Sequence, residues 1–302
     1  MGPTLIHRVR SFNRTVTSSI GALDDHFLGR DRPLAEARLL WETGDAGAEV
    51  RELRRRLGLD SGYFSRLLRS LERHGLVSVV PGAADARLRR IQLTAAGIAE
   101  WQELDRRSDL LAASLLEPLP EAEREQLASA MAQVERLMIR AQITIDVEPA
   151  ASADVRWCFS RYFAELDRRF ENGFDAARSN PADAADLTLP AGLVLVARMR
   201  SDPVGCGALK LHADGVAELK RMWVAPRLRG TGLGSRLLRE LERRAAENVA
   251  TTIQLETNRS LVEAVEMYRR AGYREVPAFN AEPYAHHWFE KRIAAGDAAR
   301  ER

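Results

Sequence analysis

The sequence contains few cysteines, and their placement argues against a disulfide scaffold and against a zinc site. Cys158 and Cys206 are the only two. Neither belongs to a CxxC motif or to a Cys/His spacing typical of metal ligands. We therefore interpret both as core residues and expect no metal in this protein.

Long apolar runs are also missing. The N-terminus from Met1 to Arg8 has no apolar signal core, and no run approaches the length of a membrane span. We therefore expect a cytoplasmic protein without a membrane partner. The 302 residues, 45% of them hydrophobic, are enough for two ordinary cores and too apolar for a disordered chain.

Charge is nearly balanced over the whole chain but not along it. The formal net charge is only +2, and lysine is nearly absent beside arginine. Residues 51–90, however, hold ten arginines against four acidic residues, a local excess of six positive charges. Such a patch indicates a polyanionic partner.

Hydrophobic periodicity changes near Gln142. Before it, apolar residues at helical spacing predict helices over 5–28, 96–116 and 121–141. After it, alternating residues predict a strand at 143–149, followed by alternating strands and helices typical of an α/β or α+β layered domain. The strands are expected at 193–200, 204–212, 217–224 and 252–257, and the helices at 154–170, 233–248 and 260–271. We expect domains at 1–142 and 143–293 and a tail at 294–302.

A helix-turn-helix pattern lies between the first predicted helices. A short helix at 49–57 precedes a second at 63–74, with Ser61 as its capping residue. The second helix turns an apolar face inward, formed by Phe64, Leu67, Leu68 and Leu71. Its other face is suited to a DNA major groove. The candidate DNA-binding residues are Ser61, Tyr63, Ser65, Arg66 and Arg69.

A hairpin with a charged tip follows this helix. Two β-like runs at 76–80 and 88–94 are joined by the turn-rich segment 81–87. Arg87 in the tip is a candidate for a DNA minor groove, where negative potential favours a guanidinium, and Asp85 is placed to orient it. A hairpin after a helix-turn-helix is a wing.

These segments resemble the MarR family of winged-helix regulators. The resemblance covers about residues 1–142 and depends on Leu59–Arg66, Leu71–Val77, Asp85-x-Arg87 and Leu93-Thr94-x-x-Gly97. It implies a mainly α winged helix-turn-helix domain that forms a homodimer through its first and last helices. The dimer would set two recognition helices on a palindromic double-stranded DNA operator.

The most specific motif is a glycine-rich turn between a predicted strand and helix, Val224–Ser235. Gly230, Gly232 and Gly234 allow the backbone to approach an anion, and the start of the following helix favours a pyrophosphate. The Rossmann pattern GxGxxG does not fit, because Ser235 stands where its third glycine is required. A Walker A motif is excluded, because the turn has no Gly-Lys-Ser/Thr ending.

The turn and the segment after it resemble the GNAT superfamily of N-acetyltransferases. Arg229-x-x-Gly232-x-Gly234 follows a strand that ends in Val-x-Pro, and Thr257-Asn258 and Met267–Tyr273 match a second motif. The resemblance runs over about residues 143–293. It implies an α/β (α+β) acyl-CoA N-acyltransferase domain with acetyl-CoA as co-substrate.

The resemblance also assigns roles to residues. Tyr268 would be the general acid that protonates the departing thiolate of coenzyme A. The implied cofactor-binding residues are Met222, Trp223, Val224, Arg229, Gly230, Thr231, Gly232, Leu233, Gly234, Ser235 and Asn258.

Acyl transfer to nitrogen also requires a group that accepts a proton from the amine. Glu218 is the first candidate, and Glu256 on the neighbouring strand is its rival. Strand alternation predicts that Glu218 shares one face of its strand with Lys220, Met222 and Val224. His286 and His287 point to opposite faces if they lie in a strand, so they are not expected to share a metal.

Together the two halves predict a bifunctional protein, a DNA-binding regulator fused to an N-acetyltransferase. Its acceptor would be a small amine or an amino-acid-like molecule. Two alternatives remain open: a regulator whose C-terminal domain only senses acyl-CoA or a small ligand, and an acetyltransferase whose winged helix serves dimerisation alone. The sequence identifies neither the acceptor nor the operator.

Overall fold

The structure is a computed structural model, and it describes residues 2–82, 88–179 and 182–293. The chain divides into two compact units, Met1–Ala128 and Ser129–Arg302. Each unit has its own hydrophobic core. Helix α6 (Glu121–Ala141) extends from the first unit into the second, and strand β4 begins at Ile143.

The described part of the N-terminal unit is mainly helical, with a small sheet. Its strands β1 (Ala48–Glu49), β3 (Arg89–Leu93) and β2 (Val77–Pro81) are adjacent in that order and antiparallel. Its helices are α1 (Pro3–Ser19), the 3₁₀ turn η1 (Phe27–Gly29), α2 (Leu34–Thr43), α3 (Val50–Leu57), α4 (Ser61–Arg73) and α5 (Ala95–Leu116).

The helix predicted at 63–74 is confirmed as α4, with one correction at its start. The four inward residues Phe64, Leu67, Leu68 and Leu71 are all buried. The cap, however, is Asp60 rather than Ser61, because the Asp60 carboxylate accepts a hydrogen bond from the Tyr63 amide at 2.8 Å. An aspartate at this position satisfies an amide that the first turn leaves without a partner.

The prediction of one helix over 5–28 is wrong. Helix α1 ends at Ser19, and the next glycine, Gly21, has a φ of 63°. Glycine takes this left-handed conformation at little cost and commonly follows a helix end. Leu28 then lies in the separate turn η1, also at positive φ.

The C-terminal unit is built on one large mixed sheet. Among the described residues it has seven strands in the order β4-β5-β6-β7-β8-β10-β9, and only β7 and β8 are parallel. The strands are β4 (Ile143–Glu148), β5 (Gly192–Met199), β6 (Asp202–Leu211), β7 (Val216–Val224), β8 (Thr252–Thr257), β9 (Arg274–Val276) and β10 (His287–Arg292). The helices are α7 (Ala153–Arg169), the 3₁₀ turn η2 (Pro226–Leu228), α8 (Leu233–Glu247) and α9 (Val262–Arg270).

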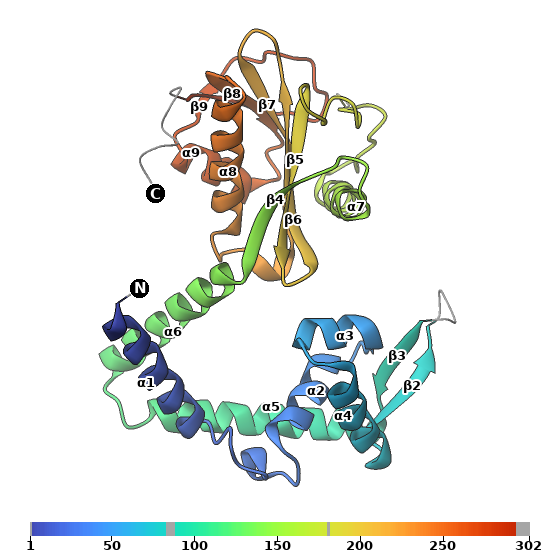
Figure 1. The fold of residues 1–302 in the computed structure, drawn as a ribbon, viewed down its shortest axis with the longest axis vertical. Coiled ribbons are helices and arrows are strands. Elements are labelled where there is room, and N and C mark those ends of the chain that lie inside the picture. Colours follow the sequence, from blue (N-terminus) through green and yellow to red (C-terminus); the bar gives the residue numbers. More distant parts are fainter. Residues whose placement is uncertain (1, 83–87, 180–181, 294–302) are drawn as a thin grey trace. The chain divides into compact units, whose positions relative to one another are not determined.

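Helices cover both faces of this sheet. Helix α7 lies against one face, and α8 and α9 lie on the other (Figure 1). Cys158 and Cys206 are both free and buried in the core of this unit, as predicted. The strands and helices expected between 143 and 271 are all present within a few residues of their predicted ends, whereas β9 and β10 were not predicted.

A β-bulge in β7 changes which residues share a face. On β6, Ala208 and Cys206 are two residues apart, but their partners Lys220 and Trp223 are three apart. The extra residue is accommodated at Arg221, whose φ is 51°. The bulge therefore returns Trp223, rather than Met222 and Val224, to the face of Glu218 and Lys220. The prediction of simple alternation through Val224 is wrong for this reason.

The pairing of β7 with β8 is short. Its register covers Val216 to Glu218 on β7, although β7 continues to Val224 and β8 to Thr257. Beyond this point the two parallel strands have no mutual register among the described residues. The site described below lies at their ends.

Candidate active site and DNA-reading surface

A groove of about 860 Å³ lies where the glycine-rich turn meets the end of β7 and the helices α8 and α9. It brings together ten of the residues that the sequence nominated. They are Met222, Trp223, Val224, Arg229, Gly230, Gly232, Leu233, Gly234, Ser235 and Tyr268.

The glycines of the turn leave the start of α8 open. Gly230 and Gly232 have φ values of 76° and 85°, and a side chain built on either would meet no atom within 4 Å. Gly232 is the N-cap of α8, and no side chain caps this end. The first amides of α8 therefore point their partial positive charge at the groove. At Gly234 a Cβ would lie 3.1 Å from the Met267 sulfur, so glycine keeps α8 and α9 close.

Two nominated cofactor residues lie outside the groove lining. Thr231 is buried, and its hydroxyl donates to the Leu228 carbonyl at 2.7 Å, which closes the turn. Asn258 is also buried. Its amide donates to the Tyr284 carbonyl at 2.7 Å and its oxygen accepts from the Ser260 amide, so it organises the loop after β8.

Arg229 lines the groove but has an acidic partner within the protein. Its guanidinium forms an ion pair with Glu165 of α7 and also donates to the Val224 carbonyl. Glu165 also accepts from the indole N–H of Trp223 at 3.0 Å and from Arg169 at 3.4 Å. This arrangement fixes Arg229 beside the end of β7 before any anion binds.

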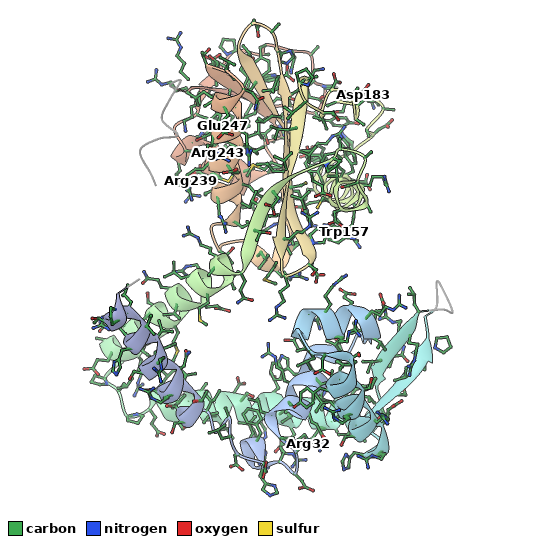
Figure 2. The ribbon with its side chains drawn as sticks, viewed as in Figure 1. Arg32, Trp157, Asp183, Arg239, Arg243 and Glu247 are labelled. Atoms are coloured by element: carbon green, nitrogen blue, oxygen red, sulfur yellow. The ribbon has the colours of Figure 1, made fainter. Side chains whose placement is uncertain are left out.

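Other cations in the groove wall were missed by the sequence reasoning. Arg239 of α8, Arg270 of α9 and Lys291 of β10 all line it. Arg239 is exposed on α8 (Figure 2). Their only sequence signal is a basic residue at helical or strand spacing, which is common on solvated faces.

Tyr268 is buried at the inner wall of the groove. Its hydroxyl has only a weak acceptor among the described residues, the Met222 sulfur at 3.9 Å. Burial, and to a smaller extent the charge of Glu256, raises the pKa of this phenol. The phenol therefore keeps its proton at neutral pH and has it available for a leaving group.

The two candidate bases share one cation. Lys220 lies 3.0 Å from Glu218 and 2.7 Å from Glu256. Glu218 also lies 3.2 Å from His212. Burial lowers the pKa of the Lys220 ammonium, and the two carboxylates raise it. The carboxylates together prevail, so this pKa lies above its ordinary value. Glu256 lines the cavity described next, whereas among the described residues Glu218 lines neither this cavity nor the groove.

A second, smaller cavity of about 110 Å³ adjoins the groove. The two share Tyr162, Leu166 and Leu261 in their walls. The cavity is bounded by α7, the ends of β7 and β8, and the segment before β10. A molecule in the cavity would face one in the groove.

In the N-terminal unit the nominated DNA-binding residues of α4 lie on one outward surface. Ser61, Ser65, Arg66 and Arg69 are exposed, and Tyr63 is half-buried with the Arg66 guanidinium 5.6 Å from its ring centre. The predicted hairpin is confirmed as β2 and β3. Arg87 and Asp85 of its tip lie outside the described residues.

The described residues contain neither a candidate metal site nor a membrane-spanning helix. No group of three or more His, Cys, Asp or Glu side chains that could hold a metal ion occurs in the described part of the chain. None of its helices is long and apolar enough to cross a membrane.

Comparison with known proteins agrees with both halves. Residues 157–273 match the acetyltransferase (GNAT) family, and residues 30–88 match the MarR family. An IAA acetyltransferase of Azospirillum brasilense is 34% identical over 40% of this chain and 78% of its own length. An uncharacterised N-acetyltransferase of Schizosaccharomyces pombe is 30% identical over 44% of this chain and 79% of its own length.

Solved structures of similar proteins each cover about half of this chain. One is a GNAT acetyltransferase from Staphylococcus aureus, with 18% identity, a TM-score of 0.43, and coverage of 50% of this chain and 99% of that one. Another is a GNAT acetyltransferase from Elizabethkingia anophelis with acetyl-CoA bound, with 17% identity and a TM-score of 0.36 over the same shares.

The groove and the two sequence relatives define an acyltransferase. The chain belongs to the GNAT acetyltransferase family through its C-terminal half, and a MarR-family segment precedes that half.

Proposed function

We propose that the chain is a bifunctional regulator and N-acetyltransferase that uses acetyl-CoA as co-substrate to acetylate the amine of a small molecule. The observation that carries the proposal is the single groove in which the glycine turn, the end of β7 and Tyr268 meet. The uncapped start of α8 suits a pyrophosphate, and Arg239 and Arg270 add positive charge along the same wall. Bound there, acetyl-CoA supplies an activated acetyl group.

The proposal assigns cofactor binding and proton donation to particular residues of the chain. The open backbone at Gly230–Ser235 holds the pyrophosphate, and Met222–Val224 at the end of β7 offers backbone groups to the pantetheine arm. Asn258 keeps the loop after β8 in place. Tyr268, neutral and without a strong acceptor, donates its proton to the departing sulfur.

We propose Glu256 rather than Glu218 as the group that accepts the amine proton. Glu256 lines the cavity that adjoins the groove. Glu218 lies between His212 and Lys220, where it holds the lysine in position. Lys220 binds one oxygen of Glu256, and the other accepts only a long hydrogen bond from the Asn280 amide, so this second oxygen is open to an amine.

For the N-terminal unit we propose sequence-specific binding of double-stranded DNA by a homodimer. Exposed polar and basic residues of α4 support the DNA contact. The dimer is supported by α1, which buries none of its residues although it carries apolar side chains. Both α1 and α6 expose large apolar side chains that a second copy of the chain could cover. In α1 they are Leu5, Ile6, Val9 and Phe12, and in α6 they are Met131, Leu137 and Met138. Sedimentation equilibrium should give twice the mass of the chain, and a monomer at micromolar concentration would contradict this part.

The cofactor site is tested by calorimetric titration of acetyl-CoA into the full chain and into Gly232→Trp. The indole ring would fill the open space above the start of α8, so binding is expected in the wild type and lost in the variant. Gly215→Trp is the matched control, because Gly215 also has a left-handed φ, 82°, but lies in the turn between β6 and β7. Absence of acetyl-CoA binding by the wild type would refute the transferase proposal.

A further inference from the structure

The cavity beside the groove has a chemical character of its own, and the following inference about it rests on the proposed function. Because it shares Tyr162, Leu166 and Leu261 with the groove, it is the place from which an acceptor would reach the acetyl group. Its walls come from separate segments of the C-terminal unit, and they provide aromatic rings, two cations (Lys220 and Arg221) and two carboxylates (Glu256 and Glu282).

The rings form a continuous cluster. Phe163 and Phe174 stack with centres 5.7 Å apart and planes at 10°, and Phe174 lies 4.9 Å from Tyr284. Phe170 contacts both Phe174 and Tyr284. All four side chains line the cavity. Clustered aromatic faces and edges favour another flat, apolar ring as their ligand.

Lys220 is already paired with Glu218 and Glu256, which leaves Arg221, the residue at the bulge of β7. Its guanidinium lies 4.5 Å from the ring centre of Phe159 and 5.3 Å from that of Phe163, and it donates to the Ala182 carbonyl at 2.5 Å. Within the described residues it has no carboxylate partner. Burial accordingly lowers the pKa of Arg221.

Other partly buried arginines of this unit do have carboxylate partners. Arg169 pairs with Glu165 and Glu263, and Arg198 pairs with Glu148 and Asp154. A half-buried guanidinium without a counterion is costly, and it is held here at a residue whose positive φ is uncommon outside glycine. A carboxylate from a ligand would relieve that cost through charge-assisted hydrogen bonds.

Of the two carboxylates, Glu282 accepts hydrogen bonds from the Ser179 hydroxyl and the Tyr284 amide, whereas Glu256 lies beside Lys220. One of its oxygens is bound by Lys220, and the other has a single long hydrogen bond, from the Asn280 amide at 3.4 Å. The Tyr162 phenol also lines the cavity, and burial is the main cause that raises its pKa. The cavity wall therefore presents the Arg221 guanidinium, which has no carboxylate partner among the described residues, and the Glu256 carboxylate, which has one weakly bound oxygen.

We propose that the acceptor is an α-amino acid with an aromatic side chain. Its carboxylate binds Arg221, its ring lies against Phe163, Phe174 and Tyr284, and its amino group faces Glu256 and the groove. In the reaction the acceptor enters as the neutral amine, its nitrogen forms a bond to the acetyl carbon, and it gives one proton to Glu256, which later passes through solvent to Tyr268 and replaces the proton that the phenol donates. The carbon–sulfur bond breaks, and the sulfur receives the proton of Tyr268. The products are the N-acetyl amino acid and free coenzyme A.

The test compares acceptors that lack one group at a time, with release of the coenzyme A thiol as the readout. L-phenylalanine carries ring, amine and carboxylate. 2-Phenylethylamine lacks the carboxylate, and L-alanine lacks the ring. We expect kcat/KM for L-phenylalanine to exceed the values for 2-phenylethylamine and L-alanine by about 100-fold. This is the order of magnitude expected from the loss of one charged hydrogen bond or one set of aromatic contacts. A wild-type preference for 2-phenylethylamine or L-alanine would overturn the proposal.

The variant Arg221→Met removes the charge and keeps the length of the side chain. It should lower kcat/KM for L-phenylalanine about 100-fold and abolish the discrimination against 2-phenylethylamine. The control is Arg161→Met, because Arg161 is exposed on α7 over Trp157 and does not line the cavity. Arg221→Lys keeps the charge without the planar fork and should retain part of the discrimination. Unchanged discrimination in Arg221→Met would overturn the inference.

Acetyl-CoA calorimetry on each preparation separates the inference from the function on which it rests. Wild type and variants should bind acetyl-CoA equally, because Arg221 does not line the groove. Acetyl-CoA binding without acetylation of any aromatic amino acid would overturn the acceptor assignment alone. Absence of acetyl-CoA binding would overturn the proposed function with it.

Discussion

The two units carry their candidate functional residues in opposite ways. In the N-terminal unit they lie on the outside of α4, whereas in the C-terminal unit they converge from separate segments on a groove and a cavity. An exposed helix face can be derived from periodicity, because its residues are neighbours in sequence. A concave site depends on packing between distant segments. The two halves therefore differ in how strongly one substitution should act.

The largest effect is expected at Tyr268. Tyr268→Phe removes the proton donor and keeps the ring, so kcat should fall about 100-fold or more while acetyl-CoA affinity is retained. Steady-state rates of thiol release and calorimetry check the two parts. Tyr273→Phe is the matched control, because the Tyr273 ring packs edge-on at 5.8 Å from Tyr268 but does not line the groove. Equal losses in the two variants would mean that hydroxyl removal acts through packing.

The sequence predicted local features well and features that depend on distant segments poorly. Periodicity was sufficient for the inward face of α4, and glycine spacing was sufficient for the turn before α8, because both are local. The bulge at Arg221 was not predictable, since it depends on register with β6. The ion pair between Arg229 and Glu165 was missed, because 64 residues separate its partners.

The cavity beside the groove is a second feature that the sequence could not predict. Glu256 was nominated as a rival base, but its position in a cavity with Arg221 and Tyr284 depends on how the loop before β10 packs against α7. No spacing rule joins segments so far apart in sequence. At the other end of the chain, the helix end at Ser19 was missed because the apolar spacing continues past it, and only the backbone shows Gly21 at positive φ.

A smaller effect is expected at Glu100 of the N-terminal unit. Arg30 and Arg32 contact this buried carboxylate at 2.5 to 3.0 Å, and these cations, Arg30 first, lower its pKa. Such a carboxylate stabilises the fold above its unfolded-state pKa, and the contribution is lost as pH falls through the lower folded-state value. Glu100→Gln should therefore reduce the unfolding free energy at pH 7 by about 2 kcal/mol, and the difference should shrink below pH ~4.

Denaturant unfolding followed by circular dichroism at several pH values measures this change. Glu103→Gln is the control on the same helix, because Glu103 pairs with Arg106 and Arg107 at the surface. Exposed pairs contribute little, so this variant should stay close to the wild type. A pH-independent loss in Glu100→Gln would show that the ion pair is not its cause.

The smallest effect per residue is expected on α4. Arg66→Ala and Arg69→Ala should each weaken binding to a duplex selected from a random pool, by about 1 kcal/mol, and should reduce the salt dependence of affinity by about one counterion if each contacts a phosphate. Fluorescence anisotropy at several salt concentrations measures both quantities. Arg259→Ala removes the same charge from an exposed site in the other unit and should change neither. If both α4 variants keep the wild-type salt dependence while Tyr268→Phe abolishes turnover, the winged helix serves dimerisation, and the concave half alone carries the chemistry of this chain.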